Sequence, residues 1–346
     1  MSKITEYGIE DQKTWDSIIR SFTDFDVFYL SDYSKAFMEE SPVNGTPLLL
    51  LFENEKDRAI NVVFRRDIAF EKKLKGLIEE GKYYDLITPY GYGGFWGHVS
   101  DWNELNKTYR EYCVANHYIC EFVRFELFSD YYNHYDGEVE TRTHNVVRSL
   151  DMSIDEIWMD FKPKVRKNVN RANSYNLNCI IDNSESYLDD FLRIYYGTMQ
   201  RTDAREDFYF SKPFFETINK MKDNAVFFFV EHEGEIISTE LVIYGSTNCY
   251  SYLGGTNQDY FDLRPNDFLK FEIIKWANEK GLRNFILGGG FGADDGIFQY
   301  KLCLAPHGVV DFHIGRRIFD SGIYNQLVNL RAKEELREEF FPLYRS

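Results

Sequence analysis

The chain has 346 residues, of which 44% are apolar and 17% aromatic, so it is long enough for two domains that each bury a core. This composition excludes a disordered chain. The net charge of −16 argues against general binding to nucleic acid, because an acidic surface repels phosphate backbones.

The sequence shows no targeting signal and no metal-binding pattern. Its longest apolar runs are strand-sized, and its first residues lack the apolar core of a secretory signal. The cysteines are scattered, with no Cys-x-x-Cys pair and no Cys/His cluster. We therefore expect a cytoplasmic protein with reduced thiols, no membrane span and no metal site.

Hydrophobic periodicity and turn residues divide the first half into regular elements. In chain order they predict two helices, a β-hairpin, a strand, a helix and a strand, over residues 14–22, 31–40, 47–68, 84–90, 101–116 and 119–128. Glycines follow the single strand, as they do in a tight turn before a helix.

The second half repeats this order. It predicts helices, a hairpin, a strand, a helix closed by a glycine and a last strand, over residues 154–175, 186–198, 225–244, 250–253, 266–280 and 283–287. Repetition after some 170 residues favours a duplicated α/β domain (mixed α+β), and two unrelated α/β domains are the alternative. We place the domains at 1–150 and 151–346, each a mixed twisted sheet flanked by helices.

Several segments carry a family resemblance. They are Leu86-Ile-Thr-Pro-Tyr-Gly-Tyr-Gly-Gly, Lys164-Val-Arg-Lys-Asn-Val-Asn-Arg-Ala, Tyr252-Leu-Gly-Gly-Thr, the helix from Arg264-Pro-Asn-Asp to Gly281, Phe285-Ile-Leu-Gly-Gly-Gly and Phe298-Gln-Tyr-Lys. Over residues 45–315 the chain resembles the tandem GNAT domains of FemAB-like proteins. That group includes peptidyltransferases that build peptidoglycan bridges and an acetyltransferase domain of surface-polysaccharide clusters.

The resemblance implies a donor site in the second domain. Two parallel strands would separate at residues 253–256 and 287–288, with the acyl donor between them and free strand amides polarising its carbonyl. The next helix would direct its N-terminus at the donor's pyrophosphate. The implied donor-binding residues are Leu253, Gly254, Gly255, Arg264, Asn266, Asp267 and Gly288. The family's pyrophosphate loop normally carries a glycine pair, and this chain has Arg264-Pro-Asn-Asp there instead.

The same resemblance suggests catalytic residues. Tyr300 stands where these enzymes often keep a tyrosine that protonates the leaving thiolate, and Lys301 beside it would bind a phosphate or the acyl oxygen. Asp294 and Asp295 are candidate bases for the attacking amine, with Glu240 a further candidate. The structural alternatives are core packing for Tyr300, surface exposure for Lys301 and helix capping for the aspartates.

A basic helix is predicted at the start of the second domain. Residues 161–181 contain no acid, and Lys164, Lys167 and Arg171 share one helical face. Such a face suits an anion, either a diphosphate on the acceptor or the acceptor stem of a tRNA. A solvated surface is the alternative.

The sequence thus predicts an acyltransferase that moves an acyl group, such as acetyl, from acyl-CoA to an amine of a sugar nucleotide or cell-envelope precursor. One alternative is an aminoacyl-tRNA-dependent FemAB-like peptidyltransferase acting on a peptidoglycan precursor, which the net charge disfavours. Another is a non-catalytic binding module, which the missing glycine pair favours. A dinucleotide-binding loop at residues 288–293, with Asp311 as ribose contact, is rejected because Pro306 ends the following helix and no further βαβ unit follows.

Overall fold

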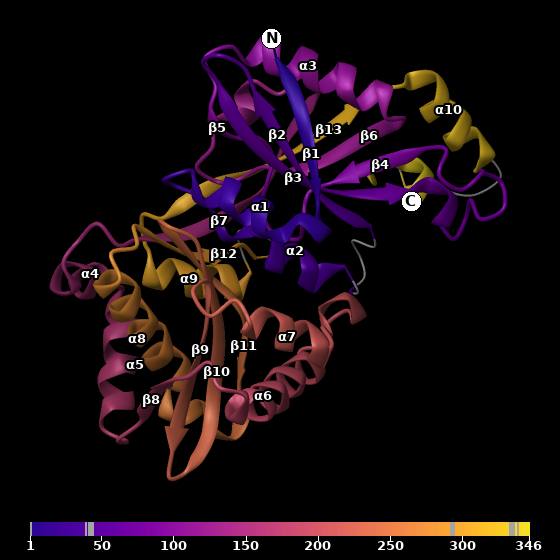
Figure 1. The fold of residues 1–346 in the computed structure, drawn as a ribbon. Helices are drawn as coiled ribbons and strands as arrows, with labels where there is room; N and C mark the ends of the chain where they lie inside the picture. Colours follow the sequence, from indigo (N-terminus) through magenta and orange to yellow (C-terminus); the bar gives the residue numbers. More distant parts are fainter. Residues whose placement is uncertain (1, 39, 41–44, 291–294, 332–335, 338) are drawn as a thin grey trace. The chain divides into compact units, whose positions relative to one another are not determined.

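A computed structural model describes residues 2–346 except 39, 41–44, 291–294, 332–335 and 338 (Figure 1). The chain forms two compact units. The first comprises Met1–Phe22, Phe28–Arg142 and Phe312–Ser346, and the second comprises Thr23–Val27 and Thr143–Asp311. These units differ from the predicted domains, because Phe312–Ser346 groups with the first unit. The physical reason is strand pairing, since residues 314–318 form an antiparallel ladder with residues 120–124.

The first unit holds a mixed sheet with the strand order β1-β2-β3-β4-β6-β13. Its strands are β1 (Lys3–Gly8), β2 (Thr46–Glu53), β3 (Arg58–Asp67), β4 (Tyr84–Ile87), β5 (Trp96–His98, paired with β3), β6 (Tyr118–Arg124) and β13 (Val309–Ile318). Its helices are α1 (Gln12–Arg20), α2 (Ser31–Phe37), α3 (Trp102–Ala115) and α10 (Ser321–Leu330). The parallel pair in this sheet is β4 with β6.

Helix α3 illustrates how the sequence builds this unit. Asp101 caps its N-terminus by accepting hydrogen bonds from the backbone amides of Asn103 and Glu104. Its buried side chains recur every four residues and belong to the same core cluster as alternate side chains of β2. They are Leu105, Tyr109 and Cys113 on the helix and Leu48, Leu50 and Phe52 on the strand.

The second unit holds a mixed sheet with the order β7-β12-β11-β10-β9-β8. Its strands are β7 (Glu138–Ser149, paired with β12 through residues 146–149), β8 (Asn178–Ile181), β9 (Ala225–His232), β10 (Glu235–Tyr244), β11 (Asn248–Thr256) and β12 (Asn284–Gly288). Its helices are α4 (Ile154–Asp160), α5 (Pro163–Asn173), α6 (Leu188–Arg201), α7 (Lys212–Asn219), α8 (Pro265–Glu279) and α9 (Gly296–Leu304).

The prediction of helix over 154–175 is wrong in its middle, because the structure has two helices there. Phe161 and Lys162 leave the helical conformation, with ψ angles of 143° and 144°. Pro163 is the cause, since its ring disfavours the α conformation in the preceding residue and is well suited to the first position of a new helix.

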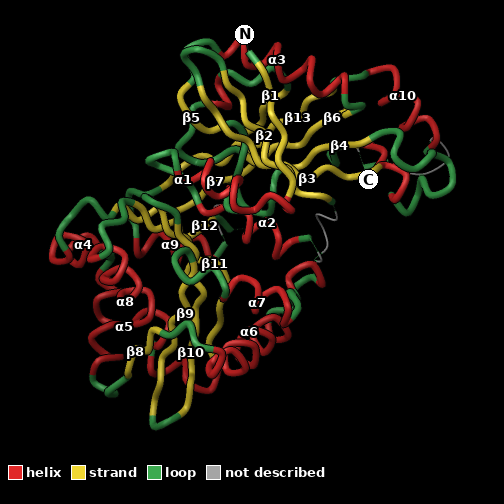
Figure 2. The backbone as a smooth tube through the Cα atoms, in the orientation of Figure 1, coloured by secondary structure: helices red, strands yellow, loops and turns green. Residues whose placement is uncertain are grey.

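Helices cover both faces of the second sheet, with α5 and α8 on one face of β9–β11 and α6 and α7 on the other (Figure 2). Strand β9 serves both faces by alternation. Phe228 packs with the core that contains α5 and α8, whereas Phe227 contacts Phe191 of α6 edge-to-face, with ring centroids 4.9 Å apart. No helix among the described residues is both long and apolar enough to cross a bilayer.

The repeated element order predicted from the sequence is confirmed. In each unit an antiparallel hairpin is followed by a third antiparallel strand, a helix, and a strand parallel to the third. These elements are β2-β3-β4-α3-β6, with the short β5 inserted before α3, and β9-β10-β11-α8-β12. The parallel pairs differ in extent. Strand β4 is paired with β6 along its whole length, Tyr84 to Ile87, whereas β11 pairs with β12 only at Asn248–Tyr250.

Candidate active site

The separation of β11 from β12 positions the candidate site. Beyond Tyr250, β11 stays paired with β10, while Gly288 at the end of β12 pairs with Val146 of β7. The β10–β11 register shifts at Tyr252, which marks a β-bulge. The two strands therefore part where the family resemblance implies that they should.

A cavity of about 360 Å³ lies where the strands part, a volume within the range of small-molecule sites. Its walls come from β10, β11, α8 and α9, and its lining residues are Thr239, Glu240, Ser251, Tyr252, Leu253, Gly254, Gly255, Asn266, Lys270, Gly296, Ile297, Tyr300 and Lys301. We call this cavity the donor pocket.

The structure gathers part of the predicted site here. The donor pocket includes Leu253, Gly254, Gly255, Asn266, Tyr300 and Lys301. Gly288 ends β12 with a φ of +81°, a conformation that favours glycine. Asp295 caps α9 by accepting a hydrogen bond from the amide of Ile297. Asp294 lies outside the described residues.

The glycines of β11 have a packing explanation. A Cβ on Gly254 would lie 2.4 Å from the carbonyl oxygen of Thr239, and one on Gly255 would lie 2.2 Å from the hydroxyl of Thr198 on α6. Close approach of β10 and α6 therefore requires both glycines whether or not a donor binds.

A buried ion pair in the pocket wall includes a residue that the sequence analysis missed. Lys270 Nζ donates to both carboxylate oxygens of Glu240, at 2.6 and 2.5 Å, and to Ser251 Oγ at 2.6 Å. Only 10% of the Lys270 side chain and 5% of that of Glu240 are exposed. A sequence signal existed, because Glu240 is the one acid within the apolar strand segment 236–244.

The two α9 side chains have distinct environments. Lys301 Nζ donates to the carbonyl oxygen of Gly289 at 2.6 Å, and burial together with the charge of Lys270 lowers the pKa of Lys301 to about 8. The Tyr300 hydroxyl accepts a hydrogen bond from Asn266 Nδ2 at 2.9 Å. Burial raises the pKa of Tyr300 well above its ordinary value, so the phenol keeps its proton at neutral pH.

The start of α8 departs from the diphosphate site that the resemblance implies. Arg264 takes a left-handed conformation and Pro265, which has no N–H, opens the helix. Asp267 is 7% exposed and accepts from Asn168 Nδ2 at 3.2 Å, and burial raises the pKa of its carboxyl. Neither Arg264 nor Asp267 lines the donor pocket. A carboxylate in the first turn competes with a diphosphate for the helix N-terminus.

The basic face of α5 is exposed. Val165, Val169 and Ala172 face the core, as predicted from their spacing. The exposed cations Lys164, Lys167 and Arg171 do not line the donor pocket and form no ion pair with a described residue. The charge of Lys164 nevertheless acts on the Asp267 carboxyl, so this end of α5 lies near the start of α8. Over the described residues, no group of three or more His, Cys, Asp or Glu side chains is arranged to hold a metal ion.

Comparison with known proteins agrees with this geometry. Residues 160–302 match the family model described as an acetyltransferase (GNAT) domain. A segment of 59 residues, 17% of this chain, is 34% identical to the Lipid II:glycine glycyltransferase of Staphylococcus epidermidis and spans 14% of that protein's length.

Solved structures extend the likeness to nearly the whole chain. The crystal structure of FemX superposes with a TM-score of 0.69 at 13% identity, covering 93% of this chain and 99% of that one. L-PGS from Bacillus licheniformis superposes with a TM-score of 0.57 at 12% identity, covering 93% and 96%. Residues 160–302 therefore match a GNAT domain, and the fold of nearly the whole chain is that of FemX.

Proposed function

We propose that this protein is an acyltransferase whose acceptor is an amine on a cell-envelope precursor of the peptidoglycan type. The observation that carries this proposal is the donor pocket at the parting of β11 and β12. Beyond Tyr250 the described part of β12 leaves one edge of β11 without a strand partner. Backbone amides on that edge suit a developing oxyanion, which is the main electrostatic demand of acyl transfer.

The relatives support this acceptor class. The curated relative is named for transfer of glycine to Lipid II, and the fold is that of FemX. An amine that attacks an ester or thioester gives an amide and releases the alcohol or thiol, so no metal or redox partner is required.

For the donor we propose an aminoacyl-tRNA, in preference to the acyl-CoA expected from the sequence. The likeness to FemX and to a glycyltransferase supports this choice. The start of α8 supports it too, because Pro265 lacks an N–H and Asp267 puts a carboxylate in the first turn, where the resemblance implies the pyrophosphate of coenzyme A. The exposed cations of α5 offer phosphate contacts on a surface that is otherwise acidic.

In this mechanism the residues of α9 act on the two oxygens of the donor ester. Protonated Lys301 stabilises the acyl oxyanion, and the neutral Tyr300 hydroxyl donates a proton to the departing ribose oxygen. An alkoxide needs such a proton more than a thiolate does, since a thiol already ionises near pH 8.5. The pair Lys270–Glu240 keeps Ser251 and the bulged strand in place.

Acyl-CoA stays the second candidate donor, since the family model that matches residues 160–302 is described as an acetyltransferase domain. A side-by-side assay separates the two. The purified protein is given a peptidoglycan pentapeptide precursor, either nucleotide-linked or lipid-linked, with labelled glycyl-tRNA or alanyl-tRNA in one arm and acetyl-CoA in the other.

We expect label transfer from charged tRNA that depends on the acceptor and is about a hundredfold slower in Tyr300→Phe. Acceptor-dependent thiol release from acetyl-CoA would instead support the second donor. No turnover in either arm, with correctly folded protein, would overturn the proposed activity and favour a binding module.

A further inference from the structure

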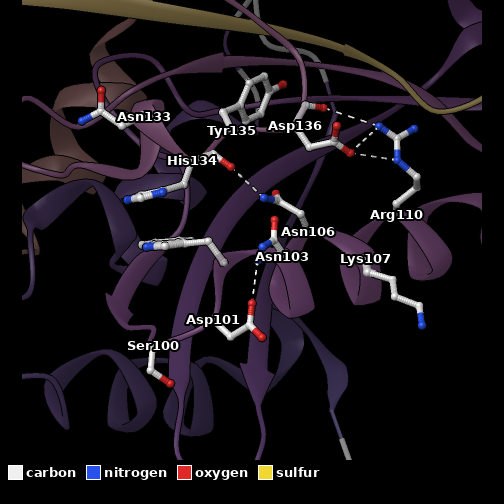
Figure 3. Close-up of a pocket in the computed structure, with 11 residues that line it drawn as sticks. Ser100, Asp101, Asn103, Asn106, Lys107, Arg110, Asn133, His134, Tyr135 and Asp136 are labelled. Carbon is white, nitrogen blue, oxygen red and sulfur yellow. Dashed lines mark hydrogen bonds and ion pairs between the residues drawn. The ribbon is translucent and has the colours of Figure 1, made fainter.

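A second cavity, of about 740 Å³, lies within the first unit (Figure 3). It is formed by the first turns of α3, with Asn103, Asn106 and Arg110 on one side, and by residues 133–136 on the other. None of these residues has a part in the proposed acyl transfer.

The walls of this cavity are fixed to each other by side chains. Asn106 is 7% exposed, and its Nδ2 donates to the carbonyl oxygen of His134 at 2.7 Å. Arg110 donates to Asp136 Oδ2 through Nε at 3.0 Å and through Nη2 at 2.6 Å. Figure 3 shows both links joining the helix to the opposite segment. The site is therefore preformed, which lowers the cost of binding.

A stack of rings forms one wall. Trp102 stacks with the buried Tyr131, with ring centroids 5.2 Å apart and planes 25° apart, and with His134, at 5.1 Å and 8°. The outer ring is that of His134, whose side chain is 40% exposed. Such a supported flat ring offers a rigid contact surface to a ligand.

The charges of the cavity are balanced, and its anion-binding groups are occupied. Asp101 already accepts from the free amides at the start of α3, and Asp136 already neutralises Arg110. The other cation, Lys107, lies 4.0 Å from Glu111, and the His134 ring lies 3.6 Å from Asp130. The lining itself holds two acids and two bases other than His134. A phosphate or carboxylate would meet carboxylates at both places, so the lining disfavours an anion.

The remaining groups are suited to hydroxyls. The amides of Asn103 and Asn133 line the cavity, and each offers both donors and an acceptor. We infer that this cavity is a binding site for a neutral saccharide, with one sugar ring packed on His134 and its hydroxyl or acetamido groups bonded to Asn103 and Asn133. The inference does not depend on the proposed acyl transfer.

Direct binding of N,N′,N″-triacetylchitotriose tests the inference. Protein NMR or calorimetry with the full chain should detect saturable binding at millimolar concentrations. His134→Ala and Asn103→Ala should each weaken binding about tenfold, or about 1.4 kcal/mol, because each removes one ligand contact. His307→Ala, which changes a histidine whose side chain is 88% exposed elsewhere, is the matched control and should bind as the parent does.

Each other outcome overturns the site. These outcomes are no chitotriose binding at about 20 mM with folded protein, equal binding by His134→Ala and the parent, and uridine or inorganic diphosphate binding here more tightly than the sugar. Melting temperatures of the variants show whether the fold is kept. Loss of acyl transfer with intact sugar binding would contradict only the proposed function.

Discussion

The ammonium of Lys270 lies 2.5 and 2.6 Å from the two carboxylate oxygens of Glu240, and both side chains are almost completely buried in the wall of the donor pocket. Removal of one partner leaves an unpaired buried charge. We therefore expect Lys270→Met or Glu240→Gln to lower the free energy of unfolding by about 3 to 5 kcal/mol. The double variant should lose much less than the sum, which urea titration can measure. Additive losses would contradict a paired role.

The pKa of Lys301 makes stability depend on pH in a defined window. Burial lowers this pKa from 10.5 in the unfolded chain to about 8 in the folded protein. Below about pH 8 the buried ammonium therefore lowers the free energy of unfolding by its full amount. Between about pH 8 and 10.5 the unfolded chain still binds the proton, so this group raises stability with pH, by at most about 1.4 kcal/mol per unit. Lys301→Met should remove that rise. The measurement is the free energy of unfolding of parent and variant at about pH 7 and pH 9.5. If the difference between the two proteins is the same at both pH values, the prediction is wrong.

Tyr300 is expected to act in turnover and not in folding. Tyr300→Phe removes the hydroxyl that Asn266 contacts and should lower kcat about a hundredfold with little change in KM, since a general acid acts in the transition state. The matched control is Tyr209→Phe, because Tyr209 is 38% exposed and lies outside the donor pocket. Unchanged kcat in Tyr300→Phe would leave Tyr300 as a packing residue.

Substitution of the exposed cations of α5 should affect substrate binding and leave the stability of the fold unchanged. Lys167→Ala and Arg171→Ala should each weaken binding of the phosphate-bearing substrate about tenfold. The free energy of unfolding should change by less than about 1 kcal/mol, so the melting temperature should hardly shift. If the substrate is tRNA, the dependence of affinity on salt should become shallower with each substitution. Full activity and an unchanged salt slope in the triple variant with Lys164→Ala would show a merely solvated surface.

The packing explanation for the glycines of β11 can be tested by comparison with Gly296, which lines the same pocket. Gly255→Ala should destabilise the protein by about 1 to 3 kcal/mol, because the new methyl group meets Thr198 and the backbone of Ile194. Thr198→Ala should restore part of that loss. Gly296→Ala should be tolerated, since no atom lies within 4 Å of its Cβ position. Equal losses at positions 255 and 296 would refute the packing explanation.

The local sequence pattern predicted most of the elements of both units. The two hairpins, α3 and α8 follow from runs of apolar residues and from turn glycines, whereas the parting of β11 from β12 was implied by the family resemblance. The pairing of residues 314–318 with β6 joins segments almost 200 positions apart, and no local signal encodes such a contact. Strand β8 is only four residues long and partly exposed, too short for a periodic pattern.

The chemistry was harder to predict than the fold. Tyr300, Lys301 and Asn266 reach the pocket as the resemblance implies. Lys270 was not predicted as a site residue, because its partner Glu240 is thirty positions earlier in the chain and a lysine within a helix ordinarily lies in solvent. The roles expected for Gly254 and Gly255 could not be read from the sequence, since close contact with a neighbouring strand or helix also selects glycine.

The unequal pairing of the two parallel strand pairs decides which unit can admit an acyl group. In the first unit, backbone hydrogen bonding continues past Ile87, where the amide of Thr88 donates to the carbonyl oxygen of Phe122. A slot that stays closed by its own backbone cannot admit an acyl group between its strands. Of these two parallel pairs, it is therefore β11 and β12 that leave room for an acyl group.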